Sequence, residues 1–247
     1  GTPFGKQLKW RMTVNSVFRV LLIAMVAQVS TNAMAHSMED VEASLNEKER
    51  YAQFVDQPAP EFDLTGVDGN TLSLADLNGK TVVLNFLYTR CTEACPFHMN
   101  LIRQLQTGVE EEGLSEEVVF ITIATDREDV AGTRRNMRAY GENFDLNPRN
   151  WQFLYRARME PPELTPELAK AYGVQFRDTG EGVQVHGVVT HVIDPEGQMR
   201  ARFHGLKFKP EHLVTYLTAI AKGPNAAAGD GFWGRLHGRI EALLQSE

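Results

Sequence analysis

The chain is poor in cysteine, in positive charge and in long apolar runs. Two cysteines among 247 residues allow at most one disulfide. The formal net charge is -7, which argues against a nucleic-acid partner because such partners select basic surfaces. The chain shows no internal repeat. Its hydrophobic content, 43%, is enough for one domain of ordinary size with a packed core.

The N-terminal residues are expected to form a targeting segment. Basic residues precede an apolar stretch, Val20 to Ala27, and Ala33-Met34-Ala35 fits a small-x-small cleavage signature. The stretch is shorter than the ~20 apolar residues that span a bilayer. We therefore expect residues 1–35 to be a signal peptide or an uncleaved membrane anchor. Either one places the remaining chain in the periplasm or cell envelope, where disulfides can form and persist.

Apolar periodicity predicts strands that alternate with helices, followed by an antiparallel pair. A hairpin is expected around the Gly66–Asn70 turn, and residues 81–88 read as a strand buried on both faces. Further strands are predicted at 118–124, 151–155, 188–193 and 199–203, and helices near Pro96, at 130–140, at 166–172 and from Pro210. This order predicts an α/β fold: a mixed sheet with flanking helices and an N-terminal β-hairpin.

One folded domain is expected, at residues 58–222. The charged segment 36–57 is predicted to be a linker or a short exposed helix. Residues 223–247 are predicted to be a small-residue linker and an amphipathic tail helix. The apolar stripe of that tail is expected to dock on its own domain or on a partner, since it lacks the strong basic face of a membrane-surface helix.

The two cysteines stand together where the 81–88 strand is predicted to end and a helix to begin. A helix N-terminus presents unpaired N–H groups and the positive end of the dipole, which lower the pKa of a thiol. Three residues separate Cys91 from Cys95, one more than in the thioredoxin-type redox pair. A disulfide closing so short a loop would stabilise the fold little, which argues against a purely structural role. A soft-metal site and a redox pair both stay open.

A copper site would need a third ligand, because thiolates suit Cu(I) but two sulfurs leave the ion under-coordinated. In a thioredoxin-like domain the loop before the penultimate strand lies against the cysteine loop. That loop is here 183–188, and it contains His186. Redox catalysts of this fold carry a proline just before the strand, where this chain has Val188. We expect His186 to face Cys91 and Cys95, with a loop histidine bonded to backbone as the alternative.

Taken together, these features resemble the SCO/SenC family, thioredoxin-like copper proteins of mitochondria and bacterial envelopes. The resemblance covers about residues 58–221 and rests on segments 60–64 and 79–86, Tyr88-Thr89-Arg90-Cys91, Cys95-Pro96, and His186 eight residues before Asp194-Pro195-Glu196-Gly197. It implies a thioredoxin-like fold and Cu(I) or Cu(II) bound by Cys91, Cys95 and His186. It also implies a copper chaperone that helps to assemble the copper centre of cytochrome c oxidase, whose copper-bearing subunit would be the partner.

The chain departs from the family pattern at three places. Thr92 follows the first cysteine, where the family usually has proline, and the segment 126–132 is one residue shorter than usual and lacks two prolines. His191 takes a strand position that is usually aromatic. These departures leave the three ligands intact but change the partner-facing surface, so a divergent branch that serves another copper enzyme or another substrate stays open.

Two other functions stay open. A thiol–disulfide oxidoreductase would use Cys91 and Cys95 on an acceptor's cysteines. A redox or copper sensor would transmit its state through the tail helix. The sequence does not decide whether the chain is an enzyme, although a metallochaperone is the favoured interpretation.

Further residues near the cysteines invite two interpretations each. His98 follows Cys95 by one helical turn; we expect it to face solvent beside a core Met99, with a transient metal donor as the alternative. His191, on a strand, is expected to be a buried, hydrogen-bonded histidine or a residue that supports a neighbouring ligand, with a metal ligand as the alternative.

Two acidic residues and the start of the mature chain complete the candidates. Asp126 and Asp129 follow a predicted strand and are expected either to cap the next helix or to recognise a partner. His36 and Met38 would lie at the mature N-terminus, where an α-amine and an imidazole can chelate copper. That interpretation is the weaker one, because chain ends are usually disordered.

Overall fold

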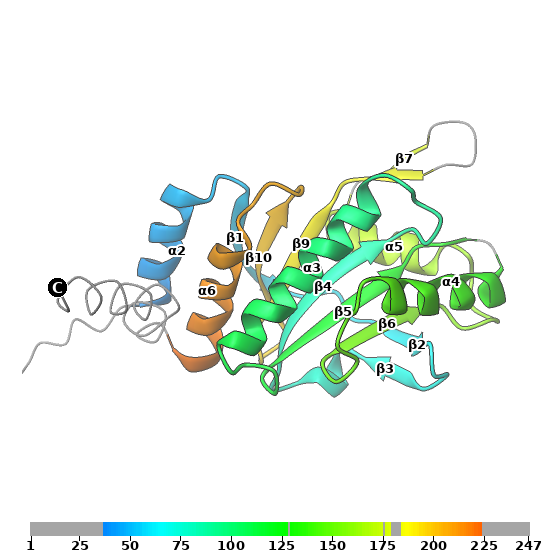
Figure 1. Ribbon diagram of the computed structural model, residues 1–247, viewed down its shortest axis with the longest axis horizontal. Helices are drawn as coiled ribbons and strands as arrows, with labels where there is room; N and C mark the ends of the chain where they lie inside the picture. Colours follow the sequence, from blue (N-terminus) through cyan, green and yellow to red (C-terminus); the bar gives the residue numbers. More distant parts are fainter. Residues whose placement is uncertain (1–36, 128, 175, 179–183, 224–247) are drawn as a thin grey trace, which may run out of the picture. The chain divides into compact units, whose positions relative to one another are not determined.

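An eight-stranded mixed sheet forms the centre of the domain, with strand order β1-β10-β9-β4-β5-β6-β2-β3 (Figure 1). The computed structural model describes residues 37–127, 129–174, 176–178 and 184–223, and for 176–178 and 184–186 it describes the backbone alone. The strands of the sheet are β1 (Ala52–Pro58), β2 (Asp63–Gly66), β3 (Thr71–Ser73), β4 (Thr81–Leu87), β5 (Val118–Ala124), β6 (Trp151–Tyr155), β9 (Val189–Ile193) and β10 (Gln198–His204). A separate antiparallel pair joins β7 (Phe176–Asp178) to β8 (Gln184–His186).

The three strands β4, β5 and β6 run parallel, whereas the other pairings in the sheet are antiparallel. All seven residues of β4 are buried, as its continuous apolar sequence predicts. Parallel strands present their carboxyl ends at one edge of a sheet. The segments that follow β4, β5 and β6 therefore emerge together, and they carry the cysteines, Asp126 and Arg156 respectively.

Helices cover both faces of the sheet. They are α2 (Met38–Lys48), α3 (Ala94–Glu111), α4 (Val130–Asn143), α5 (Leu164–Ala171) and α6 (Pro210–Lys222), with a 3-10 turn, η1, at Ala75–Leu77. In Figure 1, α3 crosses the sheet in the foreground, with α6 and α2 to its left and α4 to its right. Apolar residues of α2, α3, α4 and α6 form one core cluster, and α5 with the β2–β3–η1 region forms a second.

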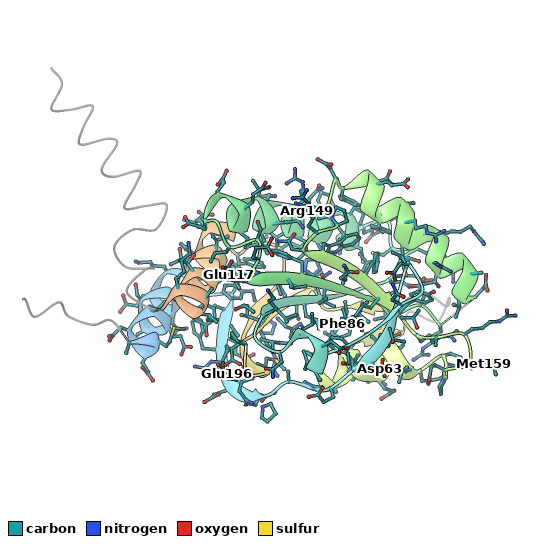
Figure 2. The ribbon with its side chains drawn as sticks, turned by 90° about the horizontal axis from the view of Figure 1, so that it is seen from below. Asp63, Phe86, Glu117, Arg149, Met159 and Glu196 are labelled. Atoms are coloured by element: carbon teal, nitrogen blue, oxygen red, sulfur yellow. The ribbon has the colours of Figure 1, made fainter. Side chains whose placement is uncertain are left out.

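The alternation of side chains along β4 separates these two cores. Val83 and Leu87 belong to the cluster with α3, whereas Val82, Leu84 and Phe86 belong to the cluster with α5. Figure 2 shows Phe86 in the interior and Met159 projecting outward at the edge where β6 ends. A sheet buried on both faces gives β4 a rigid end, which is where the cysteine loop begins.

Residues 37–57 pack as part of the domain, which corrects the predicted domain start at Pro58. β1 pairs with β10 along the sheet edge, and Val41 and Leu45 of α2 are buried in the main core. The carboxylate of Glu49, at the end of α2, accepts hydrogen bonds from Lys209 N (2.9 Å) and His212 Nδ1 (3.1 Å). β1 was not predicted, because its half-exposed, polar pattern is that of an edge strand.

The remaining predicted elements are found within a few residues of their expected ends. The predicted hairpin is β2–β3, the predicted antiparallel end is β9–β10, and α4 continues three residues beyond its predicted end at Tyr140. Short strands β7 and β8 were not predicted. The expected targeting segment at 1–35, the expected mature start His36, and residues 224–247 of the predicted linker and tail helix lie outside the described residues. No helix within the described part of the chain is long and apolar enough to cross a membrane.

Candidate functional site

Both cysteines lie at the junction between β4 and α3. Cys91 N–H donates to Tyr88 O at 3.0 Å, which turns the chain after the strand, and Cys95 lies in the first turn of α3. Both are free thiols; Cys91 is partly exposed and Cys95 is buried. Glu93, the N-cap residue of α3, makes no side-chain cap. The Cys91 sulfur instead receives backbone N–H groups of Glu93, Ala94 and Cys95, so it takes the place of a capping oxygen.

The two thiols differ in their ease of ionisation. Burial raises the pKa of Cys91, but hydrogen bonds from the Cys95 thiol and from three backbone N–H groups outweigh burial, and the net pKa is lowered. Burial raises the pKa of Cys95 strongly, and the Cys91 thiol and the carboxylate of Asp126 add to the increase. The pair therefore consists of an accessible sulfur that ionises readily and a buried one that does not.

Asp126 holds the start of the cysteine loop. Its carboxylate is buried and accepts two hydrogen bonds from Thr89, one from the backbone N–H (3.0 Å) and one from the hydroxyl (2.6 Å). Of the two functions expected for Asp126 and Asp129, helix capping is found only for Asp129, which accepts N–H groups of Ala131 and Gly132 at the start of α4. Asp126 instead joins the ends of β4 and β5.

Helix α4 contacts the same loop from the side. Asn136 donates its amide N–H to Thr89 Oγ1 at 3.1 Å, and the hydroxyl of Tyr140 donates to Cys91 O at 3.1 Å. Burial, with the negative charge of the thiolates and of Asp126 nearby, raises the pKa of Tyr140 to about 12. Asn136 and Tyr140 were not predicted, because nothing in a helical sequence shows which face meets a distant loop.

His98 is buried, which corrects the expectation that it faces solvent. It is 1% exposed, and its Nε2 lies 2.9 Å from Thr190 Oγ1. This contact places the start of β9 against the first turns of α3. Met99 is fully buried, as expected, and its sulfur lies 3.9 Å from Asn85 Nδ2 on β4.

His191 is buried and hydrogen-bonded, as expected. Its ring nitrogens lie 3.2 Å from Leu84 O and 3.0 Å from Tyr172 O. Burial lowers the pKa of His191 to about 4, although the two carbonyl oxygens favour its protonated form. His191 packs against the aromatic rings of Phe86 and Tyr172 in the second core, so it is structural.

His186, the predicted third ligand, is placed by its backbone alone. It ends β8 and pairs with Phe176, and its side chain lies outside the described residues. Among the described side chains, no group of three or more His, Cys, Asp or Glu could hold a metal ion. The ligand set Cys91, Cys95 and His186 therefore stays a prediction.

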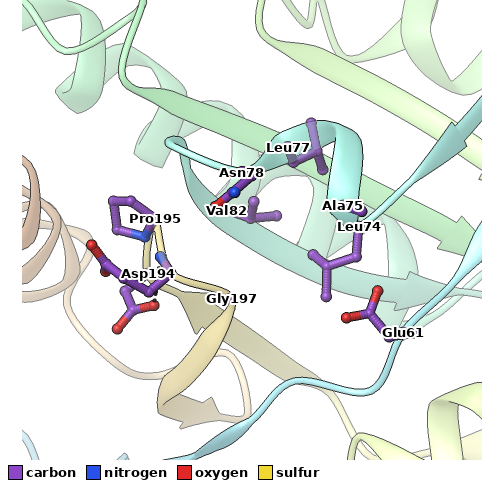
Figure 3. Close-up of a pocket in the computed structure, with 10 residues that line it drawn as sticks. Glu61, Leu74, Ala75, Leu77, Asn78, Val82, Asp194, Pro195 and Gly197 are labelled. Carbon is purple, nitrogen blue, oxygen red and sulfur yellow. Dashed lines mark hydrogen bonds between the residues drawn. The ribbon is translucent and has the colours of Figure 1, made fainter.

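A shallow pocket of about 220 Å³ lies at the opposite end of β4 from the cysteines (Figure 3). Val82, at the start of β4, and the Asp194–Gly197 turn line it, together with Glu61 and residues of the η1 turn. Asp194 is engaged in its own turn, where Oδ1 accepts N–H groups of Glu196 and Gln198. The thiols lie away from this pocket, beyond the other end of β4.

The fold and the thiol pair define a thioredoxin-like protein with two cysteines at the junction between β4 and α3. The chain belongs to the SCO1/SenC family, whose model matches residues 50–222. Among curated proteins it is 21% identical over 150 residues to a SCO1 protein homolog of Bacillus subtilis, covering 60% of this chain and 75% of that protein. It is 25% identical over 170 residues to the thiol-disulfide oxidoreductase ResA of Bacillus thuringiensis, covering 67% and 78%.

Solved structures confirm the fold. A SCO1/SenC family lipoprotein from Bacillus anthracis is similar with a TM-score of 0.60 and 22% identity, over 68% of this chain and 98% of that one. Bradyrhizobium japonicum ScoI with copper bound is similar with a TM-score of 0.53 and 23% identity, over 66% and 99%. At these identities the likeness establishes the thioredoxin-like architecture that the sequence predicts.

Proposed function

We propose that this chain is a copper chaperone of the cell envelope that binds copper through Cys91, Cys95 and His186. The observation that carries the proposal is the contact between the two thiols, which offers two soft sulfur donors at one point. Thiolates are preferred ligands of Cu(I). The copper-bound ScoI relative and membership of the SCO1/SenC family support the choice of metal. The expected acceptor is the copper centre of cytochrome c oxidase.

Two observations support His186 as the third ligand. Thr190, at the start of β9, touches His98, which follows Cys95 by one helical turn. His186 lies four residues before Thr190, so its backbone is within about 14 Å of that contact even in a fully extended chain. A neutral imidazole would complete a three-coordinate site and leave one face open to an incoming ligand of the acceptor.

The residues around the thiols determine how copper is held and released. Binding of Cu(I) removes a proton from each thiol, so affinity falls as the pH drops and protons compete for the sulfurs. Cys91 ionises first because its sulfur receives the N–H groups of α3. Oxidation of the pair to a disulfide withdraws both sulfur ligands, which couples release of copper to redox state.

A second function is favoured by the unequal thiols. The accessible Cys91, with its lowered pKa, is suited to attack, and the buried Cys95 is suited to resolve the product. Cys91 thiolate would attack an acceptor disulfide and expel one acceptor thiolate, leaving a mixed disulfide. Cys95 thiolate would then attack Cys91 and expel the second acceptor thiolate, so that two electrons pass to the acceptor. The likeness to ResA supports this reaction.

An envelope location fits both functions, since disulfide chemistry belongs to oxidising compartments. The lipoprotein from Bacillus anthracis supports such a location. The expected targeting segment at residues 1–35 would supply the export signal or the anchor.

Copper titration of the full chain, reduced and kept without oxygen, tests the proposal. We expect one Cu(I) per chain, no tight binding in Cys91→Ser or Cys95→Ser, and markedly weaker binding in His186→Ala. His204→Ala is the matched control, because His204 is an exposed histidine on β10 that contacts Gln53. Equal affinity of His186→Ala and the parent protein would remove His186 from the site. If the chain bound no copper but reduced disulfides rapidly, only the oxidoreductase function would remain.

A further inference from the structure

The peptide after Cys91 is held by a group outside the cysteine loop. The Tyr140 hydroxyl donates to Cys91 O at 3.1 Å. Because the peptide unit is planar, fixing this carbonyl also fixes the orientation of the plane that joins Cys91 to Thr92. Residues 88–93 contain neither proline nor glycine, so no residue of the loop restricts this plane by its own covalent structure.

Tyr140 is itself held in place by its neighbours on α4 and β6. Its ring stacks on Phe144, with centroids 5.6 Å apart, and meets the edge of Phe153 at 6.4 Å. Asp129 caps the start of the helix, and Asn136, one turn before Tyr140, bonds to Thr89, two residues before Cys91. The hydroxyl of Tyr140 is therefore a fixed point against which the loop is positioned.

We infer that Tyr140 is a positioning residue for the thiol pair: its hydroxyl holds Cys91 in the geometry of the dithiol and so sets the equilibrium between dithiol and disulfide. Bonded sulfurs lie about 2.05 Å apart, closer than sulfurs in hydrogen-bond contact, so Cys91 must shift toward Cys95 when the disulfide forms. A carbonyl anchored to α4 opposes that shift. The inference rests on the proposed function only in treating Cys91 and Cys95 as one reactive pair.

The equilibrium is measured on the full chain against glutathione, without copper. Protein dithiol and oxidised glutathione exchange to protein disulfide and two reduced glutathione molecules, so two electrons and two protons leave the protein thiols. Tyr140→Phe keeps the ring and removes only the donor. We expect it to shift the equilibrium toward the disulfide by about fivefold, as the loss of one ordinary hydrogen bond from the dithiol form predicts.

Tyr172→Phe is the matched control. Tyr172 also donates its hydroxyl to a backbone carbonyl, Pro60 O at 2.8 Å, but it belongs to the second core. Both variants lose a Tyr-to-carbonyl bond and should be destabilised to a similar extent in urea unfolding. Only Tyr140→Phe should move the glutathione equilibrium, which separates positioning of the pair from general stability.

Thr92→Pro tests whether the hydrogen bond from Tyr140 acts by holding the peptide that joins Cys91 to Thr92. Proline restricts its own φ and the ψ of the residue before it, which are the torsions on either side of the anchored plane. The N–H groups that approach the Cys91 sulfur belong to other residues, 93 to 95, so proline at 92 spares them. We expect Thr92→Pro to change the parent equilibrium less than twofold and to restore most of the shift caused by Tyr140→Phe.

Three results would overturn the inference. They are an unchanged equilibrium in Tyr140→Phe, an equal shift in Tyr172→Phe, and a shift in Tyr140→Phe that Thr92→Pro leaves in place. Because copper is absent from the measurement, a chain that binds no copper would contradict the proposed function without affecting this test.

Discussion

Thr89 and Asp126 lie 37 residues apart in the sequence, yet two hydrogen bonds join them beside the cysteines. The carboxylate of Asp126 is buried and its charge lies close enough to Cys95 to raise the pKa of that thiol, after burial and the neighbouring Cys91. Thr89 also accepts a hydrogen bond from Asn136 of α4. One threonine therefore connects the ends of β4 and β5 with a helix, two residues before the accessible sulfur.

Asp126→Asn should weaken this connection and change the buried thiol. We expect the free energy of unfolding to fall by about 1–3 kcal/mol, because hydrogen bonds to a charged, buried acceptor are lost or weakened. The pKa of Cys95 should fall, since a nearby negative charge disappears. Urea unfolding and the pH dependence of thiolate absorbance measure the two effects. Asp145→Asn, at an exposed ion pair with Arg103, should change neither.

The two thiols should react at very different rates. In Cys95→Ser, the remaining Cys91 is partly exposed and its sulfur receives helix N–H groups, so it should be alkylated rapidly by iodoacetamide at neutral pH. In Cys91→Ser, the remaining Cys95 is buried and its pKa is raised, so alkylation should be slower by at least about tenfold. Comparable rates in the two variants would contradict the assignment of Cys91 as the attacking sulfur.

Acid should destabilise the fold through His191. Its pKa in the folded chain is about 4, below the ordinary 6.5, so the unfolded chain binds a proton that the folded chain excludes. The stability that depends on neutral His191 is fully present above about pH 6.5 and declines as the pH falls toward 4. The loss approaches about 3 kcal/mol.

Urea unfolding at several pH values between 7 and 4.5 measures this contribution. His191→Gln should be less stable than the parent at pH 7 but should lose less stability on acidification. His204→Gln is the comparison, because burial also lowers the pKa of His204 but this residue is more exposed. A parent and a His191→Gln variant with parallel pH profiles would show that His191 does not carry the effect.

The N-terminal elements should be essential for folding. A chain that begins at Pro58 lacks α2 and all of β1 except Pro58. It therefore leaves most of β10 without its edge partner and removes Val41 and Leu45 from the main core. We expect it to be unfolded by circular dichroism, whereas a chain that begins at His36 keeps its melting transition. Glu49→Ala should fall between them, because it removes the acceptor that joins α2 to Lys209 and His212.

The sequence predicts the centre of this fold better than its edges. β4 and β5 are continuous apolar runs, and α3 and α6 show helical spacing, so local pattern is sufficient there. β1 is half-exposed and pairs with β10, far along the chain, whereas β8 has only three residues and pairs with the equally short β7. Such elements carry little periodic signal of their own, so they can be found only from the tertiary structure.

The residues of the candidate site also differ in how far the local sequence predicts them. Spacing alone identifies Cys91 and Cys95, because their positions relative to one strand and one helix are local. The exposure of His98 was predicted wrongly, since Thr190, whose hydroxyl lies 2.9 Å from its Nε2, is 92 residues away. Asn136 and Tyr140 were not predicted because their role depends on how α4 packs against the loop.

X-ray absorption at the copper edge tests the three-ligand site most directly. For the reduced, Cu(I)-loaded full chain, the account predicts two sulfur ligands and one imidazole nitrogen, with loss of the nitrogen in His186→Ala and no change in His204→Ala. A parent spectrum with sulfur ligands alone, or one that His186→Ala leaves unchanged, would contradict the account.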